Sequence, residues 1–125
     1  MESETTRPMM HIGELAERTE LSLRTIRHYD EIGLLKPSGR TEGGFRLYTE
    51  GDYARLMLIR RMKPLGFPLE DMSELLRIID TLKHDGGSEL REQLDQFIDR
   101  AVEQRVKLQH QLDMADEFIS LLRSQ

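Results

Sequence analysis

The final segment of the chain restricts the fold more than any other part of the sequence. After Ser88 no proline or glycine occurs up to the end at Gln125. Apolar side chains recur there in alternating steps of four and three residues, which is the spacing of a heptad repeat. A single helix over residues 89–124 would be about 54 Å long at ~1.5 Å per residue. The apolar seam consists of Leu94, Ile98, Ala101, Leu108, Leu112, Ala115, Ile119 and Leu122, and Arg105 interrupts it.

A helix of this length extends beyond any compact domain that the remaining residues can form. A domain of roughly 75 residues spans only about 30 Å. An apolar stripe that overhangs its own domain needs a partner, and a second copy of the chain is the simplest one. The alternative is a helix that breaks near Gln109 or Gln111 and folds back on the rest of the chain. The sequence therefore predicts a dimerisation coiled coil, with this alternative left open.

The composition excludes several classes of protein. Without cysteine the chain can form no disulfide, thiolate metal site, iron–sulfur cluster or thiol nucleophile. The four histidines show no ligand spacing, so we expect no metal and no cofactor. No nucleophile-elbow, P-loop or dinucleotide-binding motif occurs, so we do not expect an enzyme. No apolar run reaches the roughly 18 residues of a membrane span, and the start lacks a signal peptide, so we expect a cytoplasmic protein without a membrane partner.

A short amphipathic helix is predicted over residues 11–18, where Ile12, Leu15 and Ala16 recur at helical spacing. A turn follows, and Ser22 is a good N-cap for a second helix. Two short helices joined by a few residues form a helix-turn-helix, a motif that places its second helix in the major groove of DNA. The pair alone does not decide the function, because any exposed helix carries polar residues.

The second predicted helix has an apolar inner face and a donor-rich outer face. At about 100° per residue, Leu23 and Ile26 point inward, whereas Arg24, Thr25 and His28 point outward. Arginine and histidine can contact base edges or phosphates, and threonine can contact a thymine methyl group. Backbone amides at the start of the helix also suit a phosphate. The candidate DNA contacts here, flanks included, are Ser22, Arg24, Thr25, Arg27, His28 and Tyr29.

A β-hairpin is predicted next, in a stretch punctuated by one proline and three glycines. In its second strand Phe45 and Leu47 share one face, and Arg46 and Tyr48 share the other. A basic wing beside a helix-turn-helix is placed to hold the phosphate backbone. The candidate DNA contacts of the wing are Arg40, Arg46 and Tyr48.

A third helix is predicted to begin after its cap, Thr49, and to end at Pro64, and a fourth helix to open at Pro68. The segment between them forms a second, helical wing. Arg61 and Lys63 lie in the last turn of the third helix, where they complement the helix dipole and can also reach phosphate. Both are therefore candidate DNA contacts.

The charges are unevenly distributed along the chain. Residues 22–63 contain nine basic against five acidic residues, whereas residues 68–125 contain seven basic against thirteen acidic ones. This asymmetry favours a half that faces nucleic acid and an acidic half with another role. The alternative is an ordinary solvated surface, so the charge distribution supports DNA binding only together with the motifs.

Three spaced motifs resemble the N-terminal DNA-binding domain of the MerR family of bacterial transcription regulators. They are HIGELAERTELSLRTIRHYDEIGLLKP, GGFRLYTEGD and LGFPLEDMSELL, and they lie within roughly residues 10–82. The resemblance implies that the helix of residues 22–30 enters the major groove and that the wing bearing Arg46 and Tyr48 grips the backbone. It also implies that the second wing, with Phe67, contacts flanking DNA and that the long helix pairs antiparallel with its twin.

Two positions depart from the family's pattern. His28 stands where the family commonly has a second tyrosine, which leaves the contact at that position in doubt. Pro68 stands where a serine or threonine cap is common, which affects how the chain enters the fourth helix.

The expected fold is mostly α: a winged helix-turn-helix head with a small β-wing and a helical second wing, followed by a long C-terminal dimerisation helix in an antiparallel coiled coil. The expected division is a flexible N-terminal arm over residues 1–10, the DNA-binding head over 11–84, and a linker turn with the coiled-coil helix over 85–125.

The expected function is sequence-specific transcription regulation by a nucleoid-associated homodimer. The resemblance implies a dimer that binds a palindromic promoter site, then bends and untwists the DNA so that RNA polymerase can engage both promoter elements. Two alternatives stay open: an architectural or excisionase-like DNA-bending protein without promoter control, and a coiled-coil adaptor whose head binds protein.

The sequence does not identify an effector. Family members that sense metals or redox state use cysteines near the long helix, and this chain has none. Members that bind drugs carry a separate C-terminal ligand domain, and we expect only a few residues after Leu122. A small apolar ligand, a protein that binds the acidic tail, and control by protein amount alone are the three options.

Overall fold

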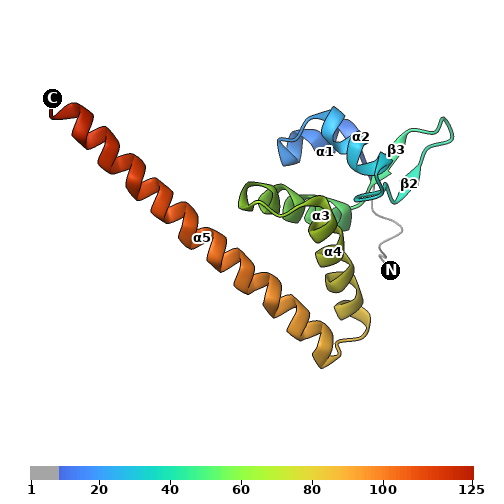
Figure 1. Ribbon diagram of the computed structural model, residues 1–125. Coiled ribbons are helices and arrows are strands. Elements are labelled where there is room, and N and C mark those ends of the chain that lie inside the picture. Colours follow the sequence, from blue (N-terminus) through green and yellow to red (C-terminus); the bar gives the residue numbers. More distant parts are fainter. Residues whose placement is uncertain (1–8) are drawn as a thin grey trace. The chain divides into compact units, whose positions relative to one another are not determined.

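The computed structural model describes residues 9–125, which are mostly helical (Figure 1). Contacts divide the chain into two compact units with the boundary between Ser73 and Glu74. Within residues 9–125 no helix combines the length and the hydropathy needed to span a membrane. The elements are β1 (Met10–His11), α1 (Ile12–Thr19), α2 (Leu23–Glu31), β2 (Gly39–Arg40), β3 (Arg46–Tyr48), α3 (Glu50–Met62), η2 (Lys63–Leu65), α4 (Leu69–His84) and α5 (Ser88–Arg123).

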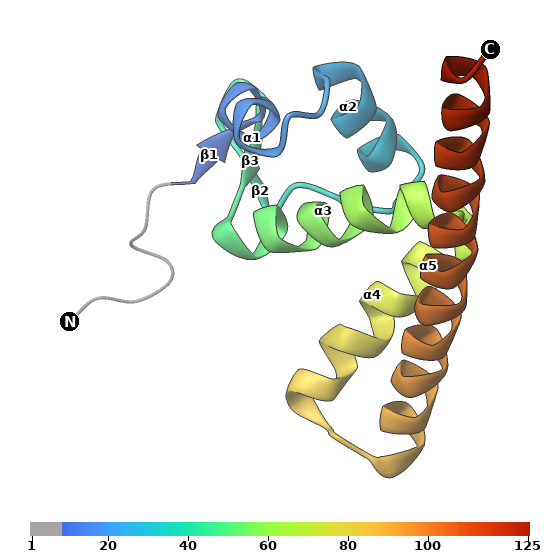
Figure 2. The same cartoon turned by 90° about the vertical axis from the view of Figure 1, so that its left-hand side faces the viewer.

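The wing is a three-stranded antiparallel sheet in the order β1–β3–β2 (Figure 2). The predicted hairpin is confirmed, with Arg40 opposite Arg46. Strand β1 was not predicted. Its Met10 pairs with Tyr48 and is 4% exposed, although Met10 belonged to the expected flexible arm. Residues 1–8 of that arm lie outside the described residues. A two-residue strand has no periodicity of its own, so only its partner strand reveals it.

The helix-turn-helix forms as predicted, from α1 and α2. The turn between them begins at Glu20, whose φ of 59° is left-handed and ends α1. Leu15 and Ile26 are fully buried where the two helices meet. Thr19 is also fully buried, and its hydroxyl donates a hydrogen bond to the carbonyl oxygen of Leu15 at 2.8 Å. That bond satisfies the one polar atom that this side chain brings into the core.

The inner face of α2 differs from the prediction. Leu23 is 39% exposed, whereas Tyr29 is 4% exposed and packs inward beside Ile26. Burial raises the pKa of the Tyr29 hydroxyl. Leu23 is the first residue of the helix and lies beyond the packed region, while the last turn of α2 is covered by the chain that follows: the amides of Leu34 and Leu35 both donate to the carbonyl oxygen of Tyr29.

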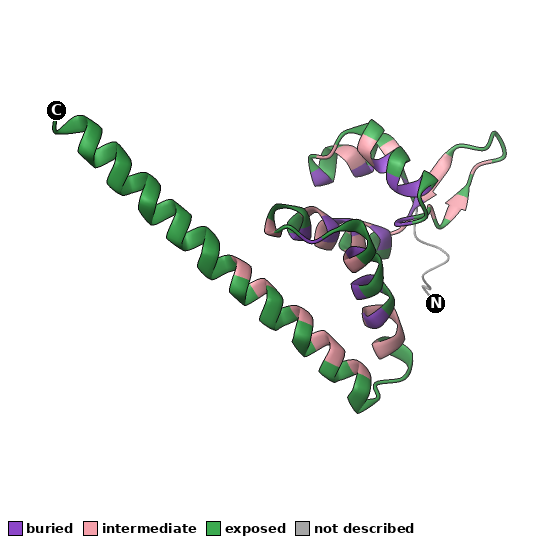
Figure 3. Ribbon diagram, viewed as in Figure 1, coloured by how far each residue is buried: buried purple, intermediate pink, exposed green. Residues whose placement is uncertain are grey.

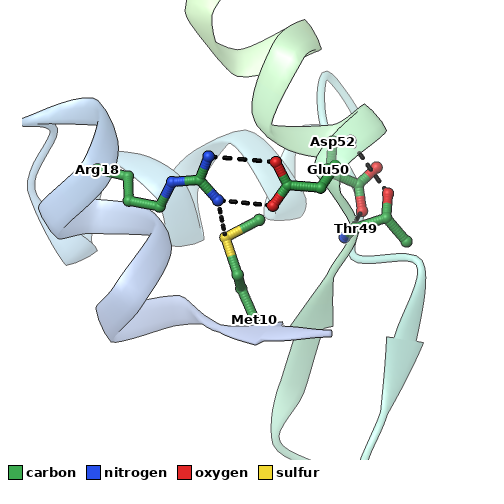
Figure 4. A network of polar contacts seen from close by, with 5 residues as sticks. All are labelled: Met10, Arg18, Thr49, Glu50 and Asp52. Carbon is green, nitrogen blue, oxygen red and sulfur yellow. Dashed lines mark hydrogen bonds and ion pairs between the residues drawn. The ribbon is translucent and has the colours of Figure 1, made fainter. Parts of the chain in front are cut away.

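Helix α3 begins with the predicted cap. Thr49 Oγ1 accepts a hydrogen bond from the Asp52 amide at 3.1 Å, and Asp52 Oδ2 accepts one from the Thr49 amide at 2.9 Å, which completes a capping box (Figure 4). Ser38, which precedes β2, donates to the same Asp52 oxygen at 2.6 Å. Asp52 is 7% exposed, so this buried carboxylate joins the start of α3 to the strand region.

Replacing Asp52 with alanine should therefore lower the free energy of unfolding by about 2 kcal/mol, because one cap and one buried acceptor are lost together. Urea unfolding followed by circular dichroism measures this change. Glu42→Ala, at an exposed wing position, is the matched control and should shift the stability by less than about 0.5 kcal/mol. Equal shifts in the two variants would contradict the structural role of Asp52.

A second polar cluster holds α1 and β1 to α3 (Figure 4). The Arg18 guanidinium donates to both carboxylate oxygens of Glu50, at 2.6 and 3.2 Å, and to the sulfur of Met10 at 3.1 Å. It also lies over the Tyr53 ring, 4.1 Å from the ring centroid. The hydrogen bond that Arg18 donates to Glu50 raises the pKa of Arg18. These contacts hold the wing's edge strand to the head, and the Arg18 and Glu50 side chains that make them are 36% and 53% exposed.

Helix α5 is one unbroken helix of 36 residues (Figure 3). The predicted long helix is thus confirmed, and the alternative of a break near Gln109 or Gln111 is wrong. Its seam residues are exposed in the single chain from Ile98 onward, with the exception of Ala101, which is half-buried.

Candidate nucleic-acid interface

The outer face of α2 carries exposed cationic side chains. Arg24, Arg27 and His28 are all exposed. Neither arginine has an ion-pair or hydrogen-bond partner within residues 9–125. Ser22 and Thr25, two further candidates, are hydrogen-bonded to each other: the Ser22 hydroxyl accepts a bond from the Thr25 amide at 3.0 Å and donates to the Thr25 hydroxyl at 2.9 Å. Ser22 thus caps the helix, and the side chains of Arg24, Arg27 and His28 remain available to a ligand.

The wing arginines are tied to α2 by a residue that the sequence analysis missed. Asp30, at the end of α2, is only 7% exposed. Its Oδ2 accepts a hydrogen bond from Arg46 Nε at 2.7 Å and a longer one from an Arg40 Nη at 3.4 Å. Lys36 Nζ lies 3.9 Å from the other oxygen. The hydrogen bond to Asp30 raises the pKa of Arg46.

This arrangement leaves positive charge in excess beside α2. Three cations meet one carboxylate, and Arg46 donates to it only through Nε. The terminal nitrogens of Arg46 have no partner within the described residues, so they remain as donors held in a fixed direction. The sequence did contain a signal for Asp30. The last turn of a helix carries partial negative charge, so an acidic side chain there is unfavourable unless a cationic partner lies beside it.

Asp30→Ala should lower the free energy of unfolding by about 2 kcal/mol, because a buried acceptor of charged hydrogen bonds is lost. It should also lower the ratio of the affinity for operator DNA to the affinity for unrelated DNA. The wing arginines lose their fixed direction, while the removed negative charge strengthens unspecific attraction. Fluorescence anisotropy on both DNAs measures the ratio. The matched control is the exposed neighbour, Glu31→Ala, which should keep the ratio; a ratio that is unchanged in Asp30→Ala would contradict the positioning role.

The second wing places two of its three candidates at the surface. Arg61 and Lys63 are exposed at the end of α3. Phe67, the third candidate, is 7% exposed and packs in the core, so its contact with DNA stays an untested prediction. Arg60, in the same turn, instead forms an ion pair with Glu20, N to O distance 3.5 Å, which links α3 to the turn after α1.

The two tyrosine candidates are largely buried. Tyr29 is 4% exposed and Tyr48 is fully buried, so their rings pack in the core and their DNA contacts stay untested predictions. Phe45, at the wing tip, is 69% exposed instead. One face of this strand carries an aromatic residue with a leucine, and the other carries an aromatic residue with an arginine. The alternation of side chains therefore did not predict which face packs inward. Burial raises the pKa of the Tyr48 hydroxyl, which has no hydrogen-bond partner in the described part of the chain.

Tyr48→Phe should leave operator affinity unchanged and should not lower the free energy of unfolding. Removing a buried hydroxyl that makes no hydrogen bond relieves a desolvation cost, so a gain of up to about 1 kcal/mol is expected. Urea unfolding and anisotropy check the two values. A tenfold loss of affinity with unchanged stability would instead restore Tyr48 as a DNA contact.

No group of three or more histidine or carboxylate side chains within residues 9–125 is placed to hold a metal ion. The candidate site consists of cationic side chains from three places. They are Arg24, Arg27 and His28 on α2, the wing pair Arg40 and Arg46 held by Asp30, and Arg61 and Lys63 in the second wing. Clustered arginines and lysines of this kind suit a phosphate backbone, and a helix face between them suits a groove.

Comparisons with known proteins agree with this description. A family model described as MerR HTH family regulatory protein matches residues 10–86. The regulator ZntR of Escherichia coli (strain K12) is 51% identical over 77 residues, which cover 61% of this chain and 55% of ZntR. The regulator YfmP of Bacillus subtilis (strain 168) is 36% identical over 117 residues, which cover 92% of this chain and 84% of YfmP.

A solved structure is similar over nearly the whole chain. HiNmlR, described as a MerR family regulator lacking the sensor domain and bound to promoter DNA, superposes with a TM-score of 0.73 at 28% sequence identity. The match covers 93% of this chain and 91% of HiNmlR. The chain thus spans about half the length of ZntR but most of the length of YfmP and of the HiNmlR structure.

Proposed function

The chain belongs to the MerR family of helix-turn-helix regulatory proteins, and from this premise we propose that it regulates transcription by binding a palindromic promoter site as a homodimer. The observation that carries the proposal is the coupling of two basic elements. Asp30 lies at the end of α2 and accepts hydrogen bonds from both wing arginines. The helix that would read the groove and the wing that would hold the backbone are thereby fixed to each other.

In this proposal each part of the head has a separate task. Arg24, Arg27 and His28 face the major groove, where arginine and histidine can donate to base edges. Arg40 and Arg46 hold phosphates on one side of that groove. On the other side the second wing does the same, through Arg61 and Lys63. Such backbone contacts set the position of the head, and the groove contacts supply sequence preference.

The dimer follows from the exposed seam of α5. Two heads carried by one coiled coil would read two half-sites on one face of the DNA, with centres about 34–36 Å or a multiple of that distance apart. When the heads cannot meet both half-sites on straight DNA, the DNA bends and untwists. Bending a site of this size costs on the order of 1–6 kcal/mol, which contacts to the backbone by the wings offset.

Transcription regulation is favoured over an architectural role, in which the same head would bend DNA without controlling a promoter. HiNmlR is described as bound to promoter DNA, and ZntR and YfmP are described as transcriptional regulators. We extend this to the present chain, with RNA polymerase at the promoter as its functional partner. Because a regulator of this kind acts on promoter DNA, we infer that it works at the chromosome, with the nucleoid in the cytoplasm.

A transcription assay with purified RNA polymerase tests the proposal. The template carries the bound palindrome between its promoter elements, and the control template carries a scrambled sequence of equal length. Addition of the protein should change the transcript yield of the first template only. Tight binding to the palindrome without any change in yield would contradict promoter control and support the architectural role.

A further inference from the structure

One charged residue lies in the apolar seam of α5. Arg105 is exposed, and the seam residues that precede and follow it, Ala101 and Leu108, are apolar. On its own helix the positions three and four residues away hold no carboxylate. Within residues 9–125 Arg105 has no ion-pair partner, and Asp116 has none either. A cation in a seam that becomes buried needs a carboxylate from elsewhere.

We propose that a second copy of the chain supplies it: α5 pairs antiparallel in the register that places Arg105 against the partner's Ala115 and beside the partner's Asp116. The inference rests on the proposed homodimer and adds its register. Two chains that run in opposite directions have facing residues at complementary positions. The facing pairs are Ile98 with the partner's Leu122, Ala101 with the partner's Ile119, Arg105 with the partner's Ala115, and Leu108 with the partner's Leu112.

Side-chain size supports this register. Each seam alanine faces a long side chain: Ala101 faces an isoleucine, and Ala115 faces Arg105. The small side chain leaves room for the aliphatic part of the arginine, whose charged end then reaches the edge of the seam. The partner's Asp116 lies on that same edge, within about 1.5 Å of Arg105 along the axis. Arg105 and Asp116 thus each gain an ion-pair partner, and the symmetric dimer contains this pair twice.

A parallel pair is disfavoured by the same residue. In parallel chains every residue faces its own copy, so the two Arg105 side chains would meet in one layer of the seam. Like charges at that distance in a partly buried layer repel each other. In the proposed antiparallel register the two Arg105 residues are about 15 Å apart along the axis. The arginine therefore selects the antiparallel orientation.

An antiparallel register shifted by one heptad is disfavoured too. It would place Arg105 against the partner's Leu108 and bring the two arginines within about 4.5 Å along the axis. It would also set Asp95 beside the partner's Asp116, whereas the proposed register sets Asp95 beside the partner's Arg123. The shifted register gains a contact between Phe97 and the partner's Phe118, but that contact lies at the exposed edge and leaves both repulsions in place.

Distances between spin labels test the register without altering the seam. The chain has no cysteine, so Glu103→Cys and Glu117→Cys each introduce a single labelling site at an exposed position outside the seam. In the proposed register both label pairs are ~21 Å apart along the axis. In the shifted register they become ~11 Å at position 103 and ~32 Å at position 117. Pulsed dipolar spectroscopy on the full-length dimer measures both, and their equality is the expected result.

A third label distinguishes the orientation. Glu89→Cys, near the start of α5, places two labels ~63 Å apart along the axis in the proposed antiparallel pair and at the same level in a parallel pair. Unequal distances at positions 103 and 117, or a short distance at position 89, overturn the register while leaving the dimer in place. Absence of any dipolar signal, with a monomeric mass in solution, overturns the homodimer itself.

The causal role of Arg105 has its own test. Arg105→Leu removes the repulsion that disfavours the shifted register, so the distance at position 117 should acquire a second, longer component. Arg105→Lys keeps the charge and should keep a single component. A single unchanged distance in Arg105→Leu would show that Arg105 does not set the register.

Discussion

Replacing Leu112 with aspartate should convert the protein into a monomer and weaken operator binding at least ~100-fold. Leu112 lies in the seam and is 56% exposed in the single chain, so the substitution leaves the fold of the chain intact. In the dimer it would bury two unpaired carboxylates, each of which costs several kcal/mol. A monomer binds only one half-site and loses the increase in affinity that comes from two linked heads, which is a factor of about 10² to 10⁴.

Met114→Asp is the matched control for this experiment. Met114 lies on the same helix, is 54% exposed, and stands outside the seam, so the same chemical change should leave the mass and the affinity as they are. Sedimentation gives the mass, and fluorescence anisotropy gives the affinity. A Leu112→Asp protein that stays dimeric, or a Met114→Asp protein that becomes monomeric, would contradict the assignment of the seam.

Replacing Arg24 and Arg27 together with alanine should weaken operator binding by ~100-fold or more and flatten its salt dependence. Each arginine that contacts a base edge contributes about 1–3 kcal/mol, and the dimer carries two copies of each. Where the contact is to phosphate, each lost cation reduces the slope of log affinity against log salt by about 0.9. Because both side chains are exposed and unpartnered within residues 9–125, thermal unfolding should be unchanged.

The control removes the same charge from the acidic half of the chain, outside the candidate site. Lys83→Ala with Arg91→Ala does so, since both residues are exposed and lie in that half. Anisotropy titrations at several salt concentrations compare the two double variants. If the control pair lost as much affinity and salt slope as the α2 pair, binding would depend on net charge alone and α2 would not be the reading helix.

The parts of the fold that could be predicted are those with local signals. The cap Ser22 begins α2 and the cap Thr49 begins α3, because a cap depends only on residues within one turn of it. The unbroken α5 follows from its lack of helix breakers and its heptad spacing. The wing hairpin follows from its glycines. The exposed cations of the candidate site were found in the same way, since charged side chains seldom enter a core.

The parts that escaped prediction depend on contacts distant in sequence. Whether Phe45 or Tyr48 faces inward is decided by β1, whose Met10 pairs with Tyr48. Tyr29 replaces Leu23 on the inner face because the chain after α2 folds over its last turn. Leu23 had been expected on the inner face of α2, and both tyrosines had been expected as DNA contacts; the burial of the two tyrosine rings was not predicted. The residue that instead organises the wing, Asp30, binds partners from the next two strands.

Selection of bound fragments from genomic DNA, followed by sequencing, tests the proposed function most directly. We expect enrichment of one palindromic motif, with half-site centres about 10–10.5 base pairs or a multiple of that spacing apart, lying between promoter elements. The Arg24→Ala, Arg27→Ala variant should enrich no such motif. Fragments of unrelated sequence retained equally by the wild-type chain would contradict sequence-specific regulation and indicate an architectural protein, and retention of no DNA at all would indicate a head that binds protein.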